Sequence, residues 1–367
     1  MSILQATLGI ALISTALAII ISLAEKVLNN YGICKIDIND GEKELAVEGG
    51  GTLLATLASE KIFIPSACGG KATCGLCKVR IAAGAGPLLP TEEPYLTAKE
   101  KSENYRLSCQ IKVKNDLKIY VPAELFNIKE YLCKVEKITD LTHDIKLLRL
   151  VLPEGEKIKF KAGQFVQFYT KPYGKVKEEV FRAYSIASAP SEDGIVELMI
   201  RLVPDGIATG YVHTALQEGD TVRLSGPYGD FYRRGGEGIE ELVMIAGGSG
   251  MAPIASLLRD IAEHQLPYKI KYFFGAATAR DMFYVEEMRE LEAKNPNFQF
   301  IPALSRSEEG DGWTGEKGNV IEVMQRYVEN ADGKEAYLCG SPGMLNACVN
   351  ALHELGFKDE AIFYDKF

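Results

Sequence analysis

The chain has 367 residues, of which 47% are hydrophobic and 25% are charged, a composition typical of a globular protein with two or three domains. The formal net charge is −9, which argues against nonspecific binding to nucleic acid. Of its 8 cysteines, three lie close together at a spacing that indicates metal ligands rather than a disulfide framework.

The first residues differ from the rest of the chain. Residues 1–24, with the sequence MSILQATLGIALISTALAIIISLA, carry no charged side chain. An α-helix needs about 20 apolar residues to cross a bilayer, so we expect a retained transmembrane anchor over residues 1–28. A signal peptide is less favoured, because it would begin with basic residues and have a shorter apolar region. Glu25 and Lys26 stand side by side, so the flanking charges do not fix an orientation.

Residues 29–130 are predicted to form a compact domain of mixed α and β structure. Asp40 and Gly41 indicate a hairpin turn between two alternating segments, and a short helix and a loop follow. The segment LSCQIKVKNDLKIYVP predicts two further strands on either side of Asn115 and Asp116.

The cysteines of this region have the spacing Cys68-x5-Cys74-x2-Cys77, and Cys109 follows 32 positions later. Four thiolates hold a [2Fe–2S] cluster, and plant-type proteins use C-x4-C-x2-C with a distant fourth cysteine. Glycines between the cysteines let the backbone curl and direct N–H groups at the sulfurs. Structural zinc is less favoured, because Cys109 has no second cysteine or histidine beside it.

From residue 131 to about residue 235, short strands separated by Gly and Pro predict an antiparallel barrel. Its strand RAYS (Arg182 to Ser185) is a weak signal alone and is also compatible with an ordinary barrel strand. The segment PDGIATGYVH (Pro204 to His213) offers glycines and a helix N-terminus, where a diphosphate can accept backbone N–H bonds. The segment GPYGDF follows it.

From residue 236 to the end, strands alternate with helices, which predicts a parallel sheet with helices on both faces. The segment IAGGSGMAP (Ile245 to Pro253) joins a strand to a helix through glycines, where a nucleotide can approach the backbone. The second candidate segment is YLCGSPGML (Tyr337 to Leu345). Cys339 within it is otherwise an ordinary buried thiol.

The order of these parts resembles the F subunits of the bacterial Na⁺-translocating NADH:quinone oxidoreductases, and the resemblance covers nearly the whole chain. In that family a membrane helix precedes a [2Fe–2S] domain with C-x5-C-x2-C spacing, a flavin barrel and an NADH-binding domain. The resemblance implies a multidomain fold of four parts. These are a transmembrane helix (1–28), a β-grasp [2Fe–2S] ferredoxin domain of α+β class (29–130), an antiparallel FAD-binding β-barrel (131–235) and an α/β NADH-binding domain with a parallel sheet (236–367).

The barrel and the last domain together resemble the ferredoxin-reductase superfamily, which implies roles for individual residues. In RAYS, Arg182 would contact the flavin phosphates, Tyr184 would pack on the isoalloxazine, and the Ser185 hydroxyl would bond near N5. Cys339 would lie near the nicotinamide C4, and the C-terminal aromatic Phe367 would cover the flavin. Ser185, Cys339 and Phe367 are thus the candidate catalytic residues. The further cofactor-binding residues are Ala183, Gly206, Ala208, Thr209, Gly247, Gly248, Gly250 and Gly340, and the cluster ligands are Cys68, Cys74, Cys77 and Cys109.

The implied function is that of an electron-input component of a membrane respiratory complex. Electrons would pass from NADH through FAD to the [2Fe–2S] cluster, then to membrane-embedded partner subunits and quinone, with coupling to Na⁺ transport. The soluble domains would lie on the cytoplasmic side of the bacterial inner membrane. NADH is favoured over NADPH, because Arg280 stands beside Asp281 with Glu286 and Glu287 nearby, which is a poor receptor for a 2′-phosphate.

Two other functions stay open. F subunits carry a longer insertion before the RAYS strand, where this chain has only PYGKVKEEVF. A membrane-tethered reductase serving an oxygenase or another metalloenzyme is therefore the alternative. A binding or assembly protein without catalysis is disfavoured, because all three cofactor sites look complete.

Overall fold

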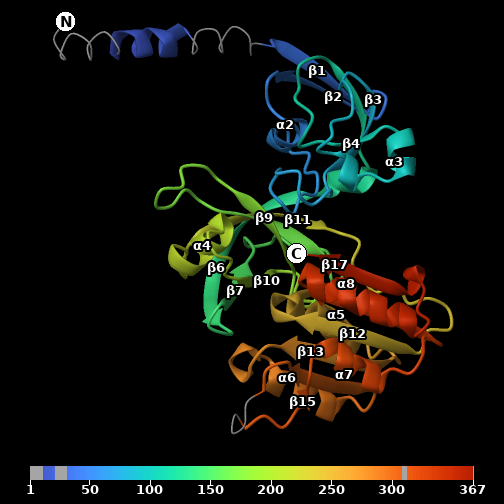
Figure 1. The fold of residues 1–367 in the computed structure, drawn as a ribbon. Coiled ribbons are helices and arrows are strands. Elements are labelled where there is room, and N and C mark those ends of the chain that lie inside the picture. The colour runs from blue at the N-terminus through green and yellow to red at the C-terminus, as the bar shows by residue number, and fades with distance from the viewer. Residues whose placement is uncertain (1–10, 21–30, 308–311, 367) are drawn as a thin grey trace, which may run out of the picture. The chain divides into compact units, whose positions relative to one another are not determined.

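The computed structural model describes residues 11–20, 31–307 and 312–366 (Figure 1). By contacts within the chain it divides between Ile128 and Lys129 into two units. Residues 11–20 are helical, and their large apolar side chains are exposed, Leu12 at 65% and Ile13 at 70%. Within the described ranges, no helix is long and apolar enough to cross a membrane. Most of the predicted anchor, residues 1–10 and 21–28, lies outside those ranges.

The N-terminal unit contains a 5-stranded mixed sheet in the order β2-β1-β5-β3-β4. Strand β1 is parallel to β5, and the other neighbours are antiparallel. Alternate residues of β1 are buried, as expected for a strand with one face on the core. The strands are β1 (Ile33–Ile38), β2 (Lys43–Glu48), β3 (Lys78–Ala83), β4 (Tyr105–Leu107) and β5 (Leu117–Tyr120), and the helices are α2 (Leu53–Ser59), η1 (Glu93–Tyr95), α3 (Ala98–Ser102) and η2 (Ala123–Asn127).

One predicted hairpin of this unit is confirmed and one predicted strand is wrong. Strands β1 and β2 pair in antiparallel register around the turn at Asp40 and Gly41. The segment just before Asn115, expected to be a strand, forms only an isolated bridge at Lys112. Its backbone instead pairs with the loop before α2 and with the first residue of that helix, since Gly50 N–H donates to the Val113 carbonyl at 2.7 Å and Leu53 N–H to the Ile111 carbonyl at 2.7 Å.

The C-terminal unit begins with a 6-stranded antiparallel sheet in the order β10-β7-β6-β11-β8-β9. A bridge between Ile186 and Leu198 joins its two ends, so the sheet is a nearly closed barrel, which confirms the prediction. The elements are β6 (Lys129–Asp140), β7 (Ile145–Val151), β8 (Phe165–Tyr169), β9 (Phe181–Ser185), β10 (Ile195–Arg201), β11 (Thr221–Tyr228) and one helix, α4 (Ile207–Thr214).

The last part of the chain forms a 6-stranded sheet in the order β15-β14-β13-β12-β16-β17, in which every neighbouring pair is parallel. This confirms the predicted α/β domain. The strands are β12 (Glu241–Gly247), β13 (Lys269–Ala276), β14 (Phe298–Leu304), β15 (Glu316–Lys317), β16 (Lys334–Gly340) and β17 (Ile362–Lys366).

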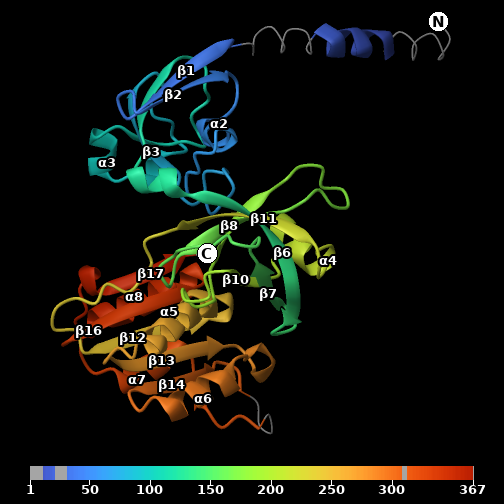
Figure 2. The same ribbon diagram turned by 180° about the vertical axis from the view of Figure 1, so that it is seen from behind.

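Helices cover this sheet on both faces (Figures 1 and 2). Helix α5 packs in one hydrophobic cluster and α7 and α8 in a second, because alternate residues of each central strand point to opposite faces. The longer helices are α5 (Met251–Glu263), α6 (Val285–Lys294), α7 (Val320–Tyr327) and α8 (Pro342–Glu354), and the short turns are η3 (Gly248–Gly250), η4 (Ala279–Asp281) and η5 (Asp359–Ala361).

The barrel and the parallel sheet are joined by a buried carboxylate. Glu197 of β10 is 7% exposed. Its Oε1 accepts from Arg149 Nη1 of the barrel at 2.8 Å, and its Oε2 accepts from Arg259 Nη1 of α5 at 3.0 Å. Beside it, the Ser256 hydroxyl of α5 donates to the Ser188 carbonyl at 2.7 Å. Apolar residues of both parts share one core cluster, so the two parts are packed as one body.

We expect Glu197→Gln to weaken this docking, because the neutral amide takes the counter-charge from Arg259 and leaves Arg149 paired only with carboxylates outside the junction, such as Glu136. The free energy of unfolding should fall by about 1–3 kcal/mol, the cost of a hydrogen bond to a charged group. Denaturant unfolding followed by circular dichroism measures it. Glu290→Gln is the matched control, since Glu290 forms an exposed pair with Lys294 that should contribute less than about 1 kcal/mol. Equal stability of the two variants would contradict the proposed role of Glu197.

Candidate functional site

The four cysteines singled out in the sequence come together in the N-terminal unit as two pairs. The Cys74 thiol donates to the Cys68 sulfur at 3.4 Å, and this bond lowers the pKa of Cys68 to about 3. A hydrogen bond from Cys77 likewise lowers the pKa of Cys109 to about 7. None of the four forms a disulfide. Thiolates, not thiols, bind metal, so each pair already holds one sulfur that is readily deprotonated.

The backbone of the cysteine loop, residues 66–77, takes a form that requires glycine. Gly69, Gly70 and Gly75 have φ of +66°, +80° and +71°, the left-handed region that other residues rarely adopt. A Cβ on Gly75 would lie 2.9 Å from the Tyr95 ring. The loop also directs donors at the sulfurs, since Lys71 N–H donates to Cys68 Sγ at 3.2 Å.

The donor set fits a binuclear cluster better than a single ion. In the part of the chain that the structure describes, no three His, Cys, Asp or Glu side chains converge on one metal position. Two separate thiol pairs are what a [2Fe–2S] cluster needs, because each iron takes two of the four cysteines. The Ser108 hydroxyl is buried near the Cys77 sulfur, where it opposes the rise in the pKa of that thiol, so it is placed to donate to a ligand thiolate there.

A buried ion pair fixes the strand that leads to Cys109. Glu92 is fully buried, and both its oxygens accept from Arg106 of β4, with Arg106 Nη2 at 2.6 Å from Oε2. Glu92 also accepts from the N–H groups of Leu89 and Leu107 at 3.0 and 2.8 Å. The pair therefore links the loop that carries Tyr95 to β4, where Arg106 stands three residues before Cys109.

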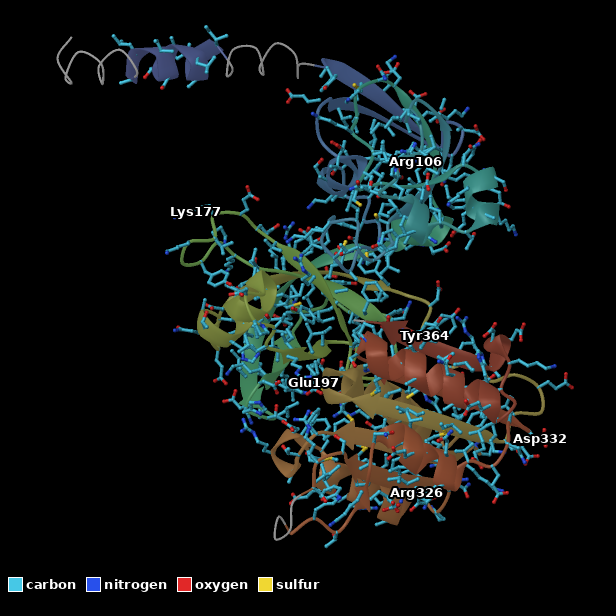
Figure 3. All side chains as sticks on the ribbon, viewed as in Figure 1. Arg106, Lys177, Glu197, Arg326, Asp332 and Tyr364 are labelled. Carbon is cyan, nitrogen blue, oxygen red and sulfur yellow. The ribbon has the colours of Figure 1, made fainter. Side chains whose placement is uncertain are left out.

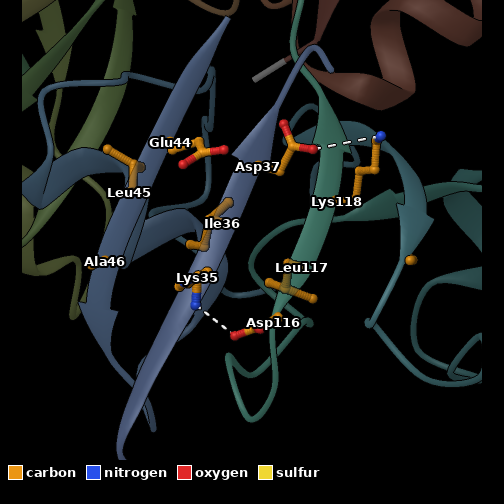
Figure 4. Close-up of a pocket in the computed structure, with 10 residues that line it drawn as sticks. Lys35, Ile36, Asp37, Glu44, Leu45, Ala46, Asp116, Leu117 and Lys118 are labelled. Atoms are coloured by element: carbon orange, nitrogen blue, oxygen red, sulfur yellow. Dashed lines mark hydrogen bonds and ion pairs between the residues drawn. The ribbon is translucent and has the colours of Figure 1, made fainter. Parts of the chain in front are cut away.

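A surface hollow lies elsewhere on the same sheet, and its lining includes no residue of the cysteine loop (Figure 4). Two of its carboxylates are already engaged. Asp37 lies 3.5 Å from the Lys118 ammonium, and Asp116 accepts from the backbone N–H of Lys35 at 2.7 Å. Because the hollow contains none of the candidate site residues singled out in the sequence, it is not a candidate for the chemistry predicted there.

The RAYS strand is β9, at one end of the barrel sheet's strand order. Arg182, Ala183 and Tyr184 are partly exposed, whereas Ser185 is buried. Arg182 Nη1 donates only to its neighbour's carbonyl, at Phe181, 2.6 Å away, so its charge has no carboxylate partner among the described residues. Burial raises the pKa of Tyr184, which stays protonated at neutral pH. Arg182 can therefore bind an anion beside the uncharged aromatic ring of Tyr184.

The predicted diphosphate turn begins helix α4. Gly206 is the N-cap residue, while Ala208 and Thr209 are buried. The Thr209 hydroxyl bonds within the turn, accepting from Val203 N–H at 3.1 Å. A Cβ on Gly206 would lie 2.5 Å from that hydroxyl. Thr209 thus shapes the turn, and the backbone N–H groups of the helix start remain as the anion donors.

The glycine turn after β12 lies at the switch point of the parallel sheet, because β12 has β13 on one side and β16 on the other. Ligands of such sheets bind at the carboxyl ends of the strands at this point. Gly247, Gly248 and Gly250 lie in this turn, next to the end of β16, which carries Cys339 and Gly340. A Cβ on Gly250 would overlap the Cys339 carbonyl oxygen, and one on Gly340 would lie 2.5 Å from Met344.

Cys339 is fully buried, and burial raises its pKa well above the ordinary value. A thiol in this state is neutral and unreactive as a nucleophile. Its backbone register partner in β17 is Asp365. Cys339 is therefore a neutral, buried group at the strand end beside the glycine turn.

Asp365 is a site residue that the sequence reasoning missed. It accepts a hydrogen bond from the Ser185 hydroxyl of the barrel at 3.4 Å, which brings the end of the chain to the RAYS strand. The sequence signal that could have identified Asp365 was its position, two residues before the terminal aromatic. Phe367 itself lies outside the described residues, and Tyr364 is 45% exposed (Figure 3).

Asp281, one of the acidic residues that favour NADH over NADPH, forms hydrogen bonds within its own loop. Asp281 Oδ2 accepts from the N–H and hydroxyl of Thr278, at 2.9 and 2.7 Å, and so caps the η4 turn. Its Oδ1 lies 3.6 Å from His143 of the barrel. Arg280 beside it is exposed at the same sheet edge. Preference for NADH over NADPH at this edge remains a prediction.

Three family models match the chain in order. They are the 2Fe-2S iron-sulfur cluster binding domain over residues 36–114, the oxidoreductase FAD-binding domain over 132–232 and the oxidoreductase NAD-binding domain over 244–350. The three domain types match the expected [2Fe–2S], FAD and NADH cofactors.

Similar proteins span the whole chain. The F subunit of the Na(+)-translocating NADH-quinone reductase of Pasteurella multocida is 37% identical over 408 residues, covering 99% of this chain and 100% of the relative. That of Neisseria gonorrhoeae is 37% identical over 407 residues with the same coverage. Because this chain has only 367 residues, both relatives carry segments with no counterpart here.

Two solved structures share most of the fold. The Amycolatopsis cytochrome P450 reductase GcoB has a TM-score of 0.72 at 27% identity and covers 91% of this chain and 98% of its own. The ferredoxin reductase of carbazole 1,9a-dioxygenase has a TM-score of 0.70 at 25% identity, covering 92% and 98%.

We expect Glu92→Gln to loosen the segment that leads to Cys109. The change leaves the buried Arg106 guanidinium without a counter-charge, and breaking a buried pair in this way costs about 3–5 kcal/mol. Thermal unfolding of the protein with bound iron should show a lower midpoint, and iron should be released faster to a chelator. Glu103→Gln is the control, because Glu103 and Lys99 form an exposed pair. Unchanged iron release would show that the Glu92–Arg106 pair does not hold the ligand segment.

Proposed function

This chain belongs to the family of F subunits of the Na(+)-translocating NADH-quinone reductases, and we propose that it is the NADH-oxidising electron-input component of a membrane respiratory complex. The observation that carries the proposal is the match of about 37% identity over 99% of the chain, with three cofactor-binding domain types in one order. Electrons would pass from NADH through FAD to the [2Fe–2S] cluster, then to membrane partner subunits and quinone, with coupling to Na⁺ transport.

Cys68, Cys74, Cys77 and Cys109 are the proposed cluster ligands. The two thiol pairs, the left-handed glycines and the N–H donor of Lys71 support this assignment. The Glu92–Arg106 pair keeps Cys109 within reach of the loop. Because the other cysteines, in β1, β6, β16 and α8, are buried within separate elements, they are not alternative ligands.

FAD would be held by the barrel. Arg182 supplies a cation for the diphosphate, Gly206, Ala208 and Thr209 form the turn whose helix N-terminus binds the anion, and Tyr184 offers an uncharged aromatic face. When bound, the flavin accepts a hydride from NADH and releases the two electrons one at a time, which lets a one-electron cluster follow a two-electron donor. Ser185 is proposed to bond near the reactive edge of the flavin, with Asp365 orienting its hydroxyl.

NADH would bind at the switch point of the parallel sheet. Gly247, Gly248 and Gly250 let the coenzyme approach the backbone at the start of α5, and Cys339 with Gly340 lines the neighbouring strand end. Phe367 is proposed to cover the flavin face, which rests on the family resemblance alone.

The membrane part of the proposal rests on the apolar N-terminal residues. Residues 1–28 are proposed as a single-pass anchor in the bacterial inner membrane, with the soluble domains on the cytoplasmic side, where NADH and reduced thiols are available. Embedded partner subunits would accept the electrons. The apolar run over residues 1–24 offers no charged side chain for an ion path, so Na⁺ transport would belong to those partners.

A reductase that serves another acceptor is the second candidate. Two observations favour it. The solved structures with the same three-part fold include reductases of a cytochrome P450 and of a dioxygenase, and this chain is shorter than the F subunits that it resembles. The two candidates share every cofactor and differ only in the acceptor.

The proposed electron path predicts a separation of activities in Cys109→Ala. NADH should still bleach the flavin at the wild-type rate, because hydride transfer does not involve the cluster, whereas the EPR signal of the reduced cluster should vanish. Cys34→Ala is the matched control, a buried free thiol of the same unit. A wild-type chain whose flavin is not reduced by NADH would refute the proposed function, and a full cluster signal in Cys109→Ala would refute the ligand assignment.

Membrane attachment predicts that the full chain sediments with membranes and that a chain starting at Tyr31 is soluble, because the removed residues hold the apolar segment. Both should reduce an artificial electron acceptor with NADH. Only membranes with the full chain should show NADH:quinone activity that rises with Na⁺. Quinone activity independent of this chain, with transfer to an oxygenase instead, would favour the second candidate.

A further inference from the structure

An arginine of the barrel reaches the nucleotide-binding turn of the parallel-sheet domain. Arg201 is the last residue of β10, and a Cβ built on Gly248 would lie 3.5 Å from its Nη1. Gly248 stands in the turn between β12 and α5, at the switch point of the sheet. A cationic group from one part of the unit therefore lies against the glycine turn of the other.

A carboxylate holds this arginine in place. Arg201 Nε donates to Asp144 Oδ2 at 2.7 Å, and Asp144 Oδ1 accepts from the Thr142 hydroxyl at 2.8 Å. The backbone carbonyl of Asp144 accepts from the N–H of Leu202 at 2.7 Å, which joins the Asp144 backbone to the residue after Arg201. Burial raises the pKa of Asp144, but the hydrogen bonds from Thr142 and Arg201 outweigh it and leave the pKa lowered. Asp144 is therefore ionised at neutral pH and orients the guanidinium.

The rest of the guanidinium remains available to a ligand. The Arg201 side chain is 57% exposed, whereas that of Asp144 is 18% exposed. Among residues 31–307 and 312–366, the structure gives Nη1 and Nη2 no acceptor, because only Nε is used by Asp144. A guanidinium whose two terminal amino groups are free is suited to a phosphate, which it can bind through two parallel hydrogen bonds from Nη1 and Nη2.

The anion expected at this turn is a diphosphate. The turn leads into the 13-residue helix α5, whose first N–H groups and dipole attract negative charge. We propose that Arg201, oriented by Asp144, binds the diphosphate of the nicotinamide coenzyme at the Gly247–Gly250 turn. This inference rests on the proposed function and adds a coenzyme-binding residue supplied by the barrel. It gives the barrel a direct part in positioning the coenzyme.

Isothermal titration of the FAD-loaded full chain with ADP-ribose tests the contact, because this ligand has the diphosphate and lacks the reacting nicotinamide. Arg201→Gln should raise the Kd for ADP-ribose about tenfold or more, as expected for loss of a charge-assisted hydrogen bond. The Kd of Arg201→Lys should lie between those of wild type and Arg201→Gln, because lysine keeps the positive charge but cannot make two parallel hydrogen bonds. Asp144→Asn should also weaken binding, because the arginine loses its anchor.

Stopped-flow flavin reduction by NADH gives the second readout. In Arg201→Gln the NADH concentration for half-maximal rate should rise by a similar factor, while the limiting rate stays close to wild type. Arg326→Gln is the matched control, an exposed arginine on α7 of the same sheet domain that pairs with Glu316 at 3.0 Å, and it should leave both values unchanged.

The outcomes separate this inference from the proposed function. If NADH reduces the wild-type flavin and Arg201→Gln binds ADP-ribose as tightly as wild type, the inference fails and the function stands. If Arg201→Gln loses FAD, the Arg201 guanidinium binds the flavin and not the nicotinamide coenzyme, and the inference is overturned. If NADH does not reduce the wild-type flavin, the proposed function fails, and the ADP-ribose titration still decides whether Arg201 binds a diphosphate.

Discussion

The fixed docking of the barrel against the parallel sheet is the constraint on which the proposed chemistry depends. Hydride transfer needs reacting groups held within a few tenths of an ångström of a productive geometry, which a loosely tethered pair of domains does not provide. The Glu197 carboxylate lies between Arg149 of the barrel and Arg259 of α5, and a shared apolar core surrounds it. Two other contacts cross the same junction, Ser185 to Asp365 and Arg201 to the turn at Gly248. Each of these would lose its geometry if the docking were lost.

Close backbone approach is the second constraint, and it explains the glycines at the nucleotide turn. Gly250 packs against the Cys339 carbonyl, so a side chain there would push the turn away from the end of β16. Gly247 and Gly340 both face the Met344 side chain of α8, which a side chain at either position would have to displace. The strands β12 and β16 meet there because the order of the sheet reverses at β12. The same absence of side chains leaves the start of α5 open to a ligand.

In the N-terminal unit, the arrangement of thiols depends on a part of the chain that contains no cysteine. The loop from Gly84 to Thr97 is tied to β4 by the fully buried Glu92, and its Tyr95 ring packs on Gly75 of the cysteine loop. A buried ion pair adds little net stability by itself, but removing one partner is costly. Its role here is positional, since it sets the strand that delivers Cys109 to the other three thiols.

The sequence alone determined the local elements and the chemistry of the donors. Cysteine spacing, the Asp40–Gly41 hairpin, the barrel strands and the alternation of strands with helices are encoded in short windows, so periodicity and turn residues revealed them. The strand expected just before Asn115 was wrong, because this segment forms only one bridge and its backbone groups pair with residues 50–53, a partner far away in sequence. Strand order, the roles of Asp365 and Arg201 and the burial of Cys339 were decided only by tertiary structure. These depend on contacts between residues more than fifty positions apart, and no local pattern of side chains specifies which distant strand end will lie beside another.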